Sequence, residues 1–296
     1  MLLLGIDIGT SSIKVAIVDA ASSKTLMTVQ YPDVETPINS IQPNWAEQDP
    51  EMWWEHVQQA ILKAHASKKY NPLDIQSIGI AYQMHGLVLV DKHQKVLRDS
   101  IIWCDSRAVE IGNKAFKNIG EEKCLSHLLN APGNFTASKL AWVKENEPAI
   151  FEKIDKLMLP GDFIAMKFTG SITTSIAALS EGIFWDFKNK AISKDILDYF
   201  GFNESIFPLV QDVFSTHGLL HSQSASALGL KEGTPITYKA GDQPNNALSL
   251  NVFEPGEVAA TAGTSSGNGV GIFSRAISST LSIQRTGTIS KPFFTF

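Results

Sequence analysis

Three short apolar runs follow one another within the first 31 residues, and they constrain the fold more than any other feature of the sequence. They occupy residues 2–6, 13–18 and 24–31, and polar turns rich in Gly and Ser separate them. Runs of this length, bounded by turn residues, are typical of β-strands rather than helices. We therefore expect the chain to begin with three strands.

A helix is expected after these strands. Asp49 has the side chain of an N-cap, Pro50 suits the first helical position, and Glu51 complements the positive end of the helix dipole. The apolar positions that follow recur with the helical period of 3.6 residues: Trp53, Val57, Ala60, Ile61 and Ala64. This pattern predicts an amphipathic helix with one buried face.

Strands and helices continue to alternate along the chain. Apolar runs predict strands at residues 75–82, 87–90, 101–103, 236–240 and 258–262. Helical patterns dominate between residues 107 and 200 and return at 244–250. Interleaved strands and helices indicate an α/β fold.

Composition excludes several classes of protein. At 296 residues the chain is long enough for about two domains. Its 44% hydrophobic content predicts a packed core, and a net charge of -5 argues against a nucleic-acid partner. Two cysteines cannot build a disulfide framework or a four-ligand zinc site. Because no long apolar run or signal peptide is evident, we expect a cytoplasmic protein without membrane contact.

Polar residues follow the first strand in a pattern suited to phosphate. Gly9 allows close approach of the backbone, and Thr10 and Ser11 add hydroxyls to successive N–H groups. Asp7, at the strand end, can hold Mg2+ through water. An ordinary hairpin with polar turn residues is the alternative interpretation.

The same design recurs at Gly263 and Thr264, after the last expected strand. Two such turns in one chain indicate a phosphate site more specifically than a single turn does. Neither has the spacing of a Walker A or a G-x-G-x-x-G motif, so any phosphate site here is of another type.

Three further loops carry reactive or polar side chains at expected strand ends. Asp242 follows the strand at 236–240 and can serve as a general base toward a hydroxyl, or as a simple helix N-cap. Met84 and His85 join two strands, and Asp105 follows another. Such loops suit a polyhydroxylated ligand, although a single histidine is more often structural.

These segments occur in order along the chain. They are Gly5-Ile6-Asp7-Ile8-Gly9-Thr10-Ser11-Ser12, Gln83-Met84-His85-Gly86, Trp103-Cys104-Asp105-Ser106-Arg107, Gly241-Asp242-Gln243 and Ala262-Gly263-Thr264-Ser265. The series resembles the FGGY carbohydrate kinases, and its Met-His-Gly and Ala-Gly-Asp-Gln segments look most like those of members that phosphorylate D-xylulose. The Lys-x-x-Trp pair Lys139 and Trp142 also resembles a helix of this family.

The resemblance implies an actin-like ATPase fold of the ribonuclease H-like class, with a sugar-binding lobe, a second lobe and a cleft between them. It implies phosphorylation of a sugar hydroxyl by ATP and Mg2+, with D-xylulose 5-phosphate as the product. The implied roles are catalytic base for Asp242, metal contact for Asp7, phosphate contact for Gly9, Thr10, Ser11, Gly263 and Thr264, and sugar contact for Met84, His85 and Asp105.

The likeness covers about residues 1–266. We expect an N-terminal lobe at 1–233, the start of a C-terminal lobe at 234–266, and an atypical tail at 267–296, as in a truncated product. A cut second lobe would leave the strands at 236–240 and 258–262 with unpaired edges, and such edges favour self-association, with a homodimer as one arrangement.

Alternative functions stay open at this point. They are a kinase for another sugar or polyol, such as glycerol, gluconate or ribulose, an inactive fragment that binds sugar only, and an actin- or chaperone-like nucleotide module.

Overall fold

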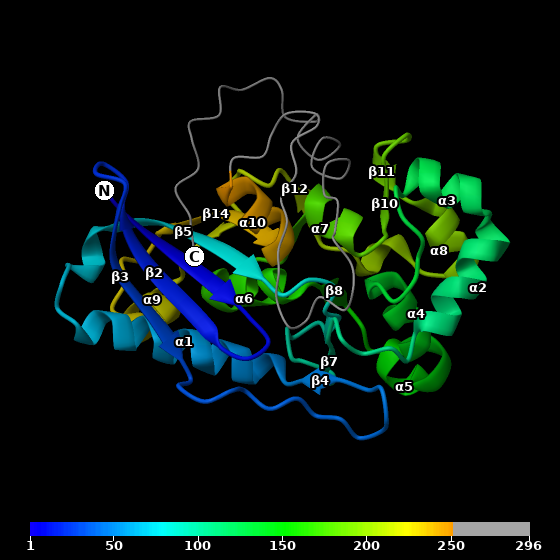
Figure 1. Ribbon diagram of the computed structural model, residues 1–296, viewed down its shortest axis with the longest axis horizontal. Coiled ribbons are helices and arrows are strands. Elements are labelled where there is room, and N and C mark those ends of the chain that lie inside the picture. The colour runs from blue at the N-terminus through cyan, green and yellow to red at the C-terminus, as the bar shows by residue number, and fades with distance from the viewer. Residues whose placement is uncertain (251–296) are drawn as a thin grey trace. The chain divides into compact units, whose positions relative to one another are not determined.

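A six-stranded sheet forms the centre of the first compact unit, Met1–Gly241, in a computed structural model that describes residues 1–250 (Figure 1). Its strand order is β13-β14-β5-β1-β2-β3. The strands are β1 (Leu2–Ile8), β2 (Ile13–Asp19), β3 (Lys24–Tyr31), β5 (Ile75–Tyr82), β13 (Gly218–Leu219) and β14 (Pro235–Gly241). The three strands predicted in the first 31 residues are confirmed, and they form an antiparallel meander.

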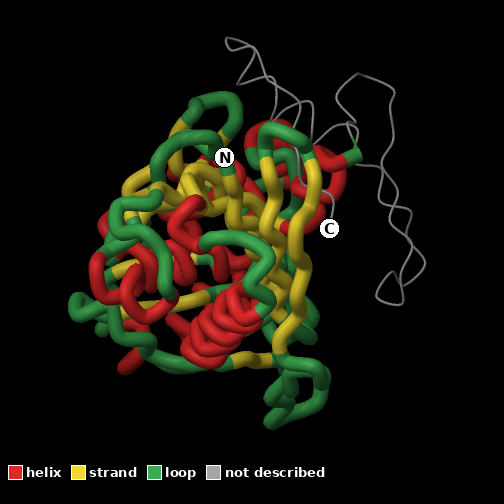
Figure 2. The backbone as a smooth tube through the Cα atoms, turned by 90° about the vertical axis from the view of Figure 1, so that its left-hand side faces the viewer, coloured by secondary structure: helices red, strands yellow, loops and turns green. Residues whose placement is uncertain are grey.

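Helix α1 (Pro50–Ala66) begins where the sequence predicts. The side chain of Asp49 accepts a hydrogen bond from the Glu51 N–H at 2.9 Å, which caps the helix. All five predicted apolar positions are at most 1% exposed. Helices α1 and α6 (Pro160–Thr169) pack on strands of the sheet, α9 (Ser222–Leu228) packs on these two helices, and together they build the first hydrophobic core. Figure 2 shows helices, in red, beside the yellow strands.

A second core lies among the helices of the middle segment, which also contains short strands. The helices are α2 (Val109–Ile119), α3 (Glu121–His127), α4 (Thr136–Asn146), α5 (Pro148–Phe151), α7 (Ile176–Glu181) and α8 (Lys194–Phe200), with a 3-10 turn at Glu204–Ile206. Another 3-10 turn, Pro72–Asp74, lies between α1 and β5. Paired short strands are β4 (Glu47–Gln48) with β7 (Ser100–Ile101), β6 (Val88–Val90) with β8 (Lys156–Met158), β9 (Thr173–Ser175) with β12 (Leu209–Gln211), and β10 (Trp185–Asp186) with β11 (Ala191–Ile192). The predicted helical character of this segment is confirmed. The strands expected at 87–90 and 101–103 correspond to β6 and to β7, which begins one residue earlier and ends at Ile101, whereas the other short strands were not predicted.

Strand β14 pairs in parallel with β5 over residues 236–241. On its other side β13 pairs only with Pro235 and Ile236, so the expectation of an unpaired edge at 236–240 is wrong for the side that faces β5 and, on the side that faces β13, only at Ile236. The first compact unit extends through Gly241, whereas we expected the first lobe to end at residue 233. Helix α10 (Asp242–Ser249) begins the second unit. The strand predicted at 258–262 lies outside the described residues.

The register of the sheet brings three strand ends level. Ile8 at the end of β1 and Gly241 at the end of β14 both pair with Tyr82, the last residue of β5. Because these strands are parallel, the segments that follow them leave the sheet at one edge.

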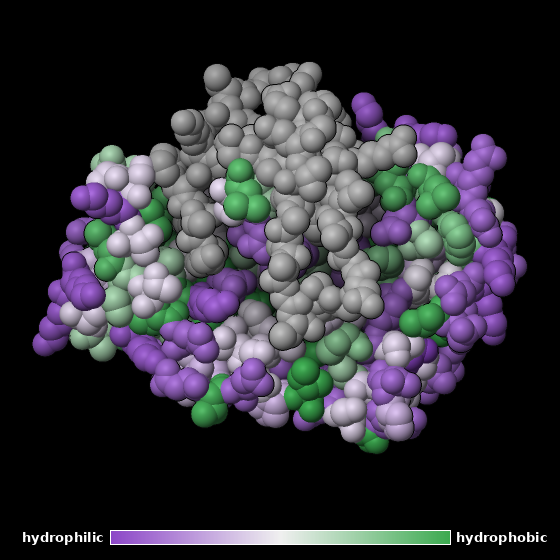
Figure 3. Space-filling model, viewed as in Figure 1, coloured by the Kyte–Doolittle hydropathy of each residue, from purple (hydrophilic) through white to green (hydrophobic). Residues whose placement is uncertain are grey.

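The described part of the chain contains no helix long and apolar enough to cross a bilayer. In the view of Figure 3, hydrophobic side chains reach the surface as separate spots among hydrophilic ones.

Candidate functional site at the edge of the sheet

The turn between β1 and β2 is tight and requires glycine. The Gly9 N–H donates to Ser12 O at 3.2 Å, and a Cβ atom at Gly9 would lie 2.9 Å from that same oxygen. The Ser11 side chain is exposed, while its carbonyl accepts the Thr36 N–H at 2.8 Å. The turn therefore joins two antiparallel strands and presents the Ser11 hydroxyl to solvent, and its contact with phosphate stays a prediction.

Thr10 connects this turn to two other loops. Its hydroxyl donates to Gln83 Oε1 and accepts from Trp103 Nε1, both at 2.9 Å. Its carbonyl accepts from Gln48 Nε2 at 2.8 Å. Because the hydroxyl proton is already used, a phosphate contact at Thr10 would rely on the backbone.

Gln48 is a residue that the sequence analysis missed. It is 1% exposed, and its Oε1 accepts from Trp53 Nε1 at 3.0 Å and from Gln83 Nε2 at 3.2 Å. A polar residue just before the helix cap is unremarkable in sequence, because its partners lie on other elements.

Asp7 lies near the end of β1 beside Ala81 of β5. Burial raises the pKa of its carboxyl group, and Lys14, whose Nζ lies 3.7 Å away, opposes that shift. The described residues hold no cluster of three or more His, Cys, Asp or Glu side chains suited to a metal. Magnesium beside phosphates needs only one or two carboxylates, so the single carboxylate of Asp7 fits an ion that also contacts a nucleotide.

His85 is held in an unusual backbone conformation by Glu181. Its φ is +63°, and its N–H donates to Glu181 Oε1 at 3.1 Å. Its Nδ1 lies 3.1 Å from the Glu181 carbonyl oxygen. A carbonyl can only accept, so Nδ1 carries the proton and Nε2 is left as an acceptor. Burial, assisted by nearby Lys139, lowers the pKa of His85 to about 4, which keeps the ring neutral.

Met84 and Glu181 pack against the last residue of β14. A Cβ atom at Gly241 would lie 2.6 Å from Met84 Cγ and 2.8 Å from Glu181 Oε2. Tyr82 Oη donates to the same carboxylate oxygen at 3.4 Å. Glu181 is 9% exposed. In the sequence it is distinguished only as the acidic last residue of the short helix α7.

Asp105 has a structural role that the sequence did not indicate. It is fully buried, and its Oδ2 accepts from the Ala46 N–H and from Arg107 Nη2, each at 2.6 Å. The Arg107 guanidinium also lies 3.7 Å from the centre of the Trp45 ring and 4.8 Å from that of Trp142. The contact between Asp105 and sugar stays a prediction.

Asp242 is bonded directly to Gly241 and is the first residue of α10. The structure thus connects it to the strand end that is level with Tyr82. The predicted phosphate residues Gly263 and Thr264 lie outside the described residues.

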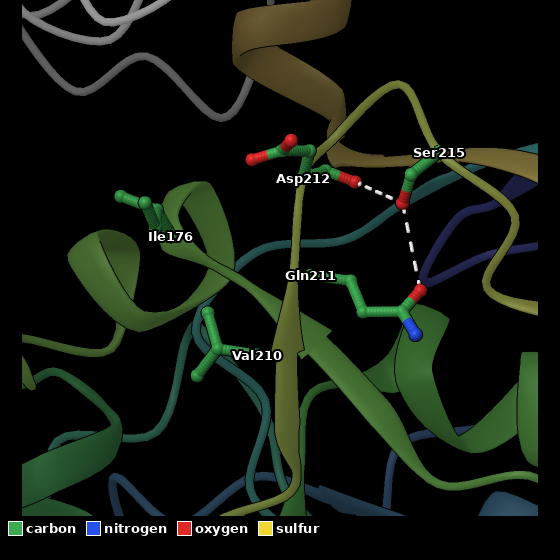
Figure 4. Close-up of a pocket in the computed structure, with 5 residues that line it drawn as sticks. All are labelled: Ile176, Val210, Gln211, Asp212 and Ser215. Atoms are coloured by element: carbon green, nitrogen blue, oxygen red, sulfur yellow. Dashed lines mark hydrogen bonds between the residues drawn. The ribbon is translucent and has the colours of Figure 1, made fainter.

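The structure also contains a pocket of about 470 Å³, whose described lining residues are Ile176, Val210, Gln211, Asp212 and Ser215 (Figure 4). Ser215 Oγ donates to the Asp212 carbonyl at 2.7 Å and lies 3.5 Å from Gln211 Oε1. The predicted site residues that the structure describes do not line it.

Comparison with known proteins places the chain in a family. Xylulose kinase of Escherichia coli K12 is 30% identical over 262 residues, which are 88% of this chain and 52% of that protein. A crystal structure of xylulose kinase from Rhodospirillum rubrum matches with a TM-score of 0.80 and 25% identity, over 87% of this chain and 52% of that one. Glycerol kinase from Plasmodium falciparum, solved with ADP, has the same fold at a TM-score of 0.80 and 23% identity, over 89% and 53% of the two chains.

The chain therefore spans about half the length of these relatives. The N-terminal domain of the FGGY family of carbohydrate kinases matches residues 2–249. The family resemblance and the predicted actin-like ATPase fold are thereby confirmed. This chain belongs to the FGGY family of carbohydrate kinases.

Proposed function

We propose that the chain is the sugar-binding part of an ATP-dependent kinase that converts D-xylulose to D-xylulose 5-phosphate. The observation that carries the proposal is the level arrangement of Ile8, Tyr82 and Gly241, which brings three loops with suitable chemistry to one edge of the sheet. Ligands of α/β sheets bind at such carboxyl ends. The similarity to xylulose kinases supports the choice of substrate.

In this proposal Asp242 accepts the proton of the attacking sugar hydroxyl. The hydroxyl oxygen forms a bond to the γ-phosphorus of ATP while the bond to the ADP oxygen breaks. The turn at Gly9, Thr10 and Ser11 contacts the phosphates, and the same role is proposed for Gly263 and Thr264, which lie outside the described residues. Asp7 would hold Mg2+, and the ion would neutralise charge on the phosphate oxygens.

His85 contributes orientation of the sugar. Its neutral ring presents Nε2 as an acceptor, so it receives a hydrogen bond from a sugar hydroxyl and cannot donate one there. Met84 adds an apolar contact beside it. Asp105 is proposed as a third contact, although its carboxylate already binds Arg107 and Ala46.

The test is release of ADP by the chain with ATP and Mg2+, in the presence and absence of D-xylulose. Asp242→Asn is expected to lower sugar-dependent turnover by about 10²–10⁴-fold. Asp212→Asn is the matched control, since Asp212 lines the pocket of Figure 4 instead. Unchanged turnover in Asp242→Asn would show that Asp242 is not the catalytic base.

A kinase for another sugar or polyol is the second candidate, because glycerol kinase shares the fold. A substrate panel separates the two candidates, and preference for glycerol or gluconate over all ketoses would reject D-xylulose. Sugar binding by calorimetry without ADP release would instead favour a chain that binds sugar but does not catalyse.

A further inference from the structure

A lysine in the middle of helix α4 is completely buried, and the proposed reaction does not use it. Lys139 is 0% exposed. Its Nζ donates to the carbonyl oxygens of His85 and Ile102, each at 2.9 Å. It thus connects a loop that follows β5 with a turn that follows β7, and these segments carry the proposed sugar contacts His85 and Asp105.

Burial of an amine disfavours its charged form, and this effect lowers the pKa of the amine. Burial lowers the pKa of Lys139 to about 7, although Asp105, Cys104 and Glu181 favour the charged form. An apolar side chain of similar length would avoid this cost, but it would leave the His85 carbonyl without this donor and the Ile102 carbonyl with the Asp105 N–H, at 3.2 Å, in place of two donors. Lys139 therefore contributes hydrogen bonds to the backbone that an apolar side chain of the same size could not make.

The surroundings of His85 show what that contribution is. Glu181 binds its N–H and Nδ1, the ring of Phe135 packs edge-on with centroids 4.6 Å apart, and Lys139 binds its carbonyl. The carbonyl contact is the one that ties this loop to Ile102. We propose that Lys139 is a positioning residue, which fixes His85 Nε2 relative to the side chains that follow Ile102 and so sets the geometry of sugar binding. This inference rests on the proposed function.

The same helix offers a matched control. Lys144 also donates to two backbone carbonyls, Phe200 O at 2.7 Å and Gly201 O at 2.6 Å. Lys144→Met removes the same type of contact from α4 without touching the His85 loop. A general loss of stability would affect both variants, whereas a positioning role affects Lys139 alone.

The experiment measures the affinity for D-xylulose by calorimetry in the wild-type chain, Lys139→Met and Lys144→Met. We expect Lys139→Met to weaken binding about tenfold or more, which equals about 1.4 kcal/mol, and Lys144→Met to leave it within about twofold. Lys139→Gln retains N–H donors on a shorter side chain and should be intermediate. If Lys139→Met does not fold, Lys139→Gln against Lys144→Met decides the question.

Hydrogen exchange without sugar provides a second, independent readout. Lys139→Met should increase exchange at residues 83–87 and 102–105, and Lys144→Met should not. Wild-type affinity in either folded Lys139 variant, equal weakening in Lys144→Met, or unchanged exchange in Lys139→Met overturns the positioning role. If the wild-type chain does not bind D-xylulose, the proposed substrate fails, and the exchange comparison still decides whether Lys139 fixes the two segments.

Discussion

Glu181 holds His85 through two different groups. The Oε1 atom of Glu181 accepts the His85 N–H, and its backbone carbonyl contacts His85 Nδ1, each at 3.1 Å. The first contact stabilises a backbone with φ of +63°, and the second decides which ring nitrogen carries the proton. One residue of α7 therefore sets both the conformation and the chemistry of the loop after β5.

Replacing Glu181 should accordingly destabilise the fold. Glu181→Ala leaves the His85 N–H and Tyr82 Oη without this acceptor, and a hydrogen bond to a charged group contributes about 1.5–3 kcal/mol. We expect the free energy of unfolding in urea to fall by about that amount. Glu181→Gln keeps an oxygen acceptor and should lose less. Equal losses in the two variants would show that the carboxylate charge, rather than the acceptor, stabilises the loop.

Two glycines provide a test of packing beneath the site. A Cβ atom at Gly161 would lie 2.1 Å from Tyr82 Cδ1, whereas one at Gly79 would meet its nearest atom, Tyr238 Cβ, at 3.7 Å. Gly161→Ala should lower the free energy of unfolding by about 1–3 kcal/mol because Tyr82 must shift. Gly79→Ala adds the same methyl group and should change it by less than about 0.5 kcal/mol. Thermal melts of both variants check this, and a stable Gly161→Ala would contradict it.

The buried pair Lys239 and Asp162 should show strong coupling. Lys239 Nζ lies 2.6 Å from Asp162 Oδ1 and 2.7 Å from Thr173 O, and both charged side chains are at most 2% exposed. Lys239→Met leaves a buried carboxylate unpaired and should cost about 3–5 kcal/mol. The double variant with Asp162→Leu should recover much of that loss. A double-mutant cycle by urea denaturation measures the coupling, and simple additivity of the two losses would refute it.

Lys139 should make stability rise with pH above neutrality. Its pKa of about 7 in the fold lies below the ordinary value of 10.5, so between these values the unfolded chain binds a proton that the folded chain does not. Stability from this group therefore increases with pH in that window, by about 2 kcal/mol between about pH 7 and pH 9. Urea denaturation at the two pH values checks the slope, which Lys139→Met should lack. The same slope in the variant would assign it to other groups.

Local sequence patterns were sufficient to predict the strands and the helix that position the site. The runs at the N-terminus predicted β1, β2 and β3, and the cap at Asp49 with its apolar face predicted α1, because each depends on neighbours within a few residues. The ordered motifs also predicted the family, which the match over residues 2–249 confirms. The roles of the individual site residues stay predictions.

Only the tertiary structure decided which polar groups meet. Glu181 and His85 are 96 residues apart, and Lys139 and His85 are 54 apart, so no local pattern marks either pair. The pairing of β14 with β5 likewise depends on a partner far away in the chain, which no local pattern marks. Hydrogen bonds between distant segments are satisfied only after the chain has packed, whereas helix caps and strand alternation are properties of the sequence itself.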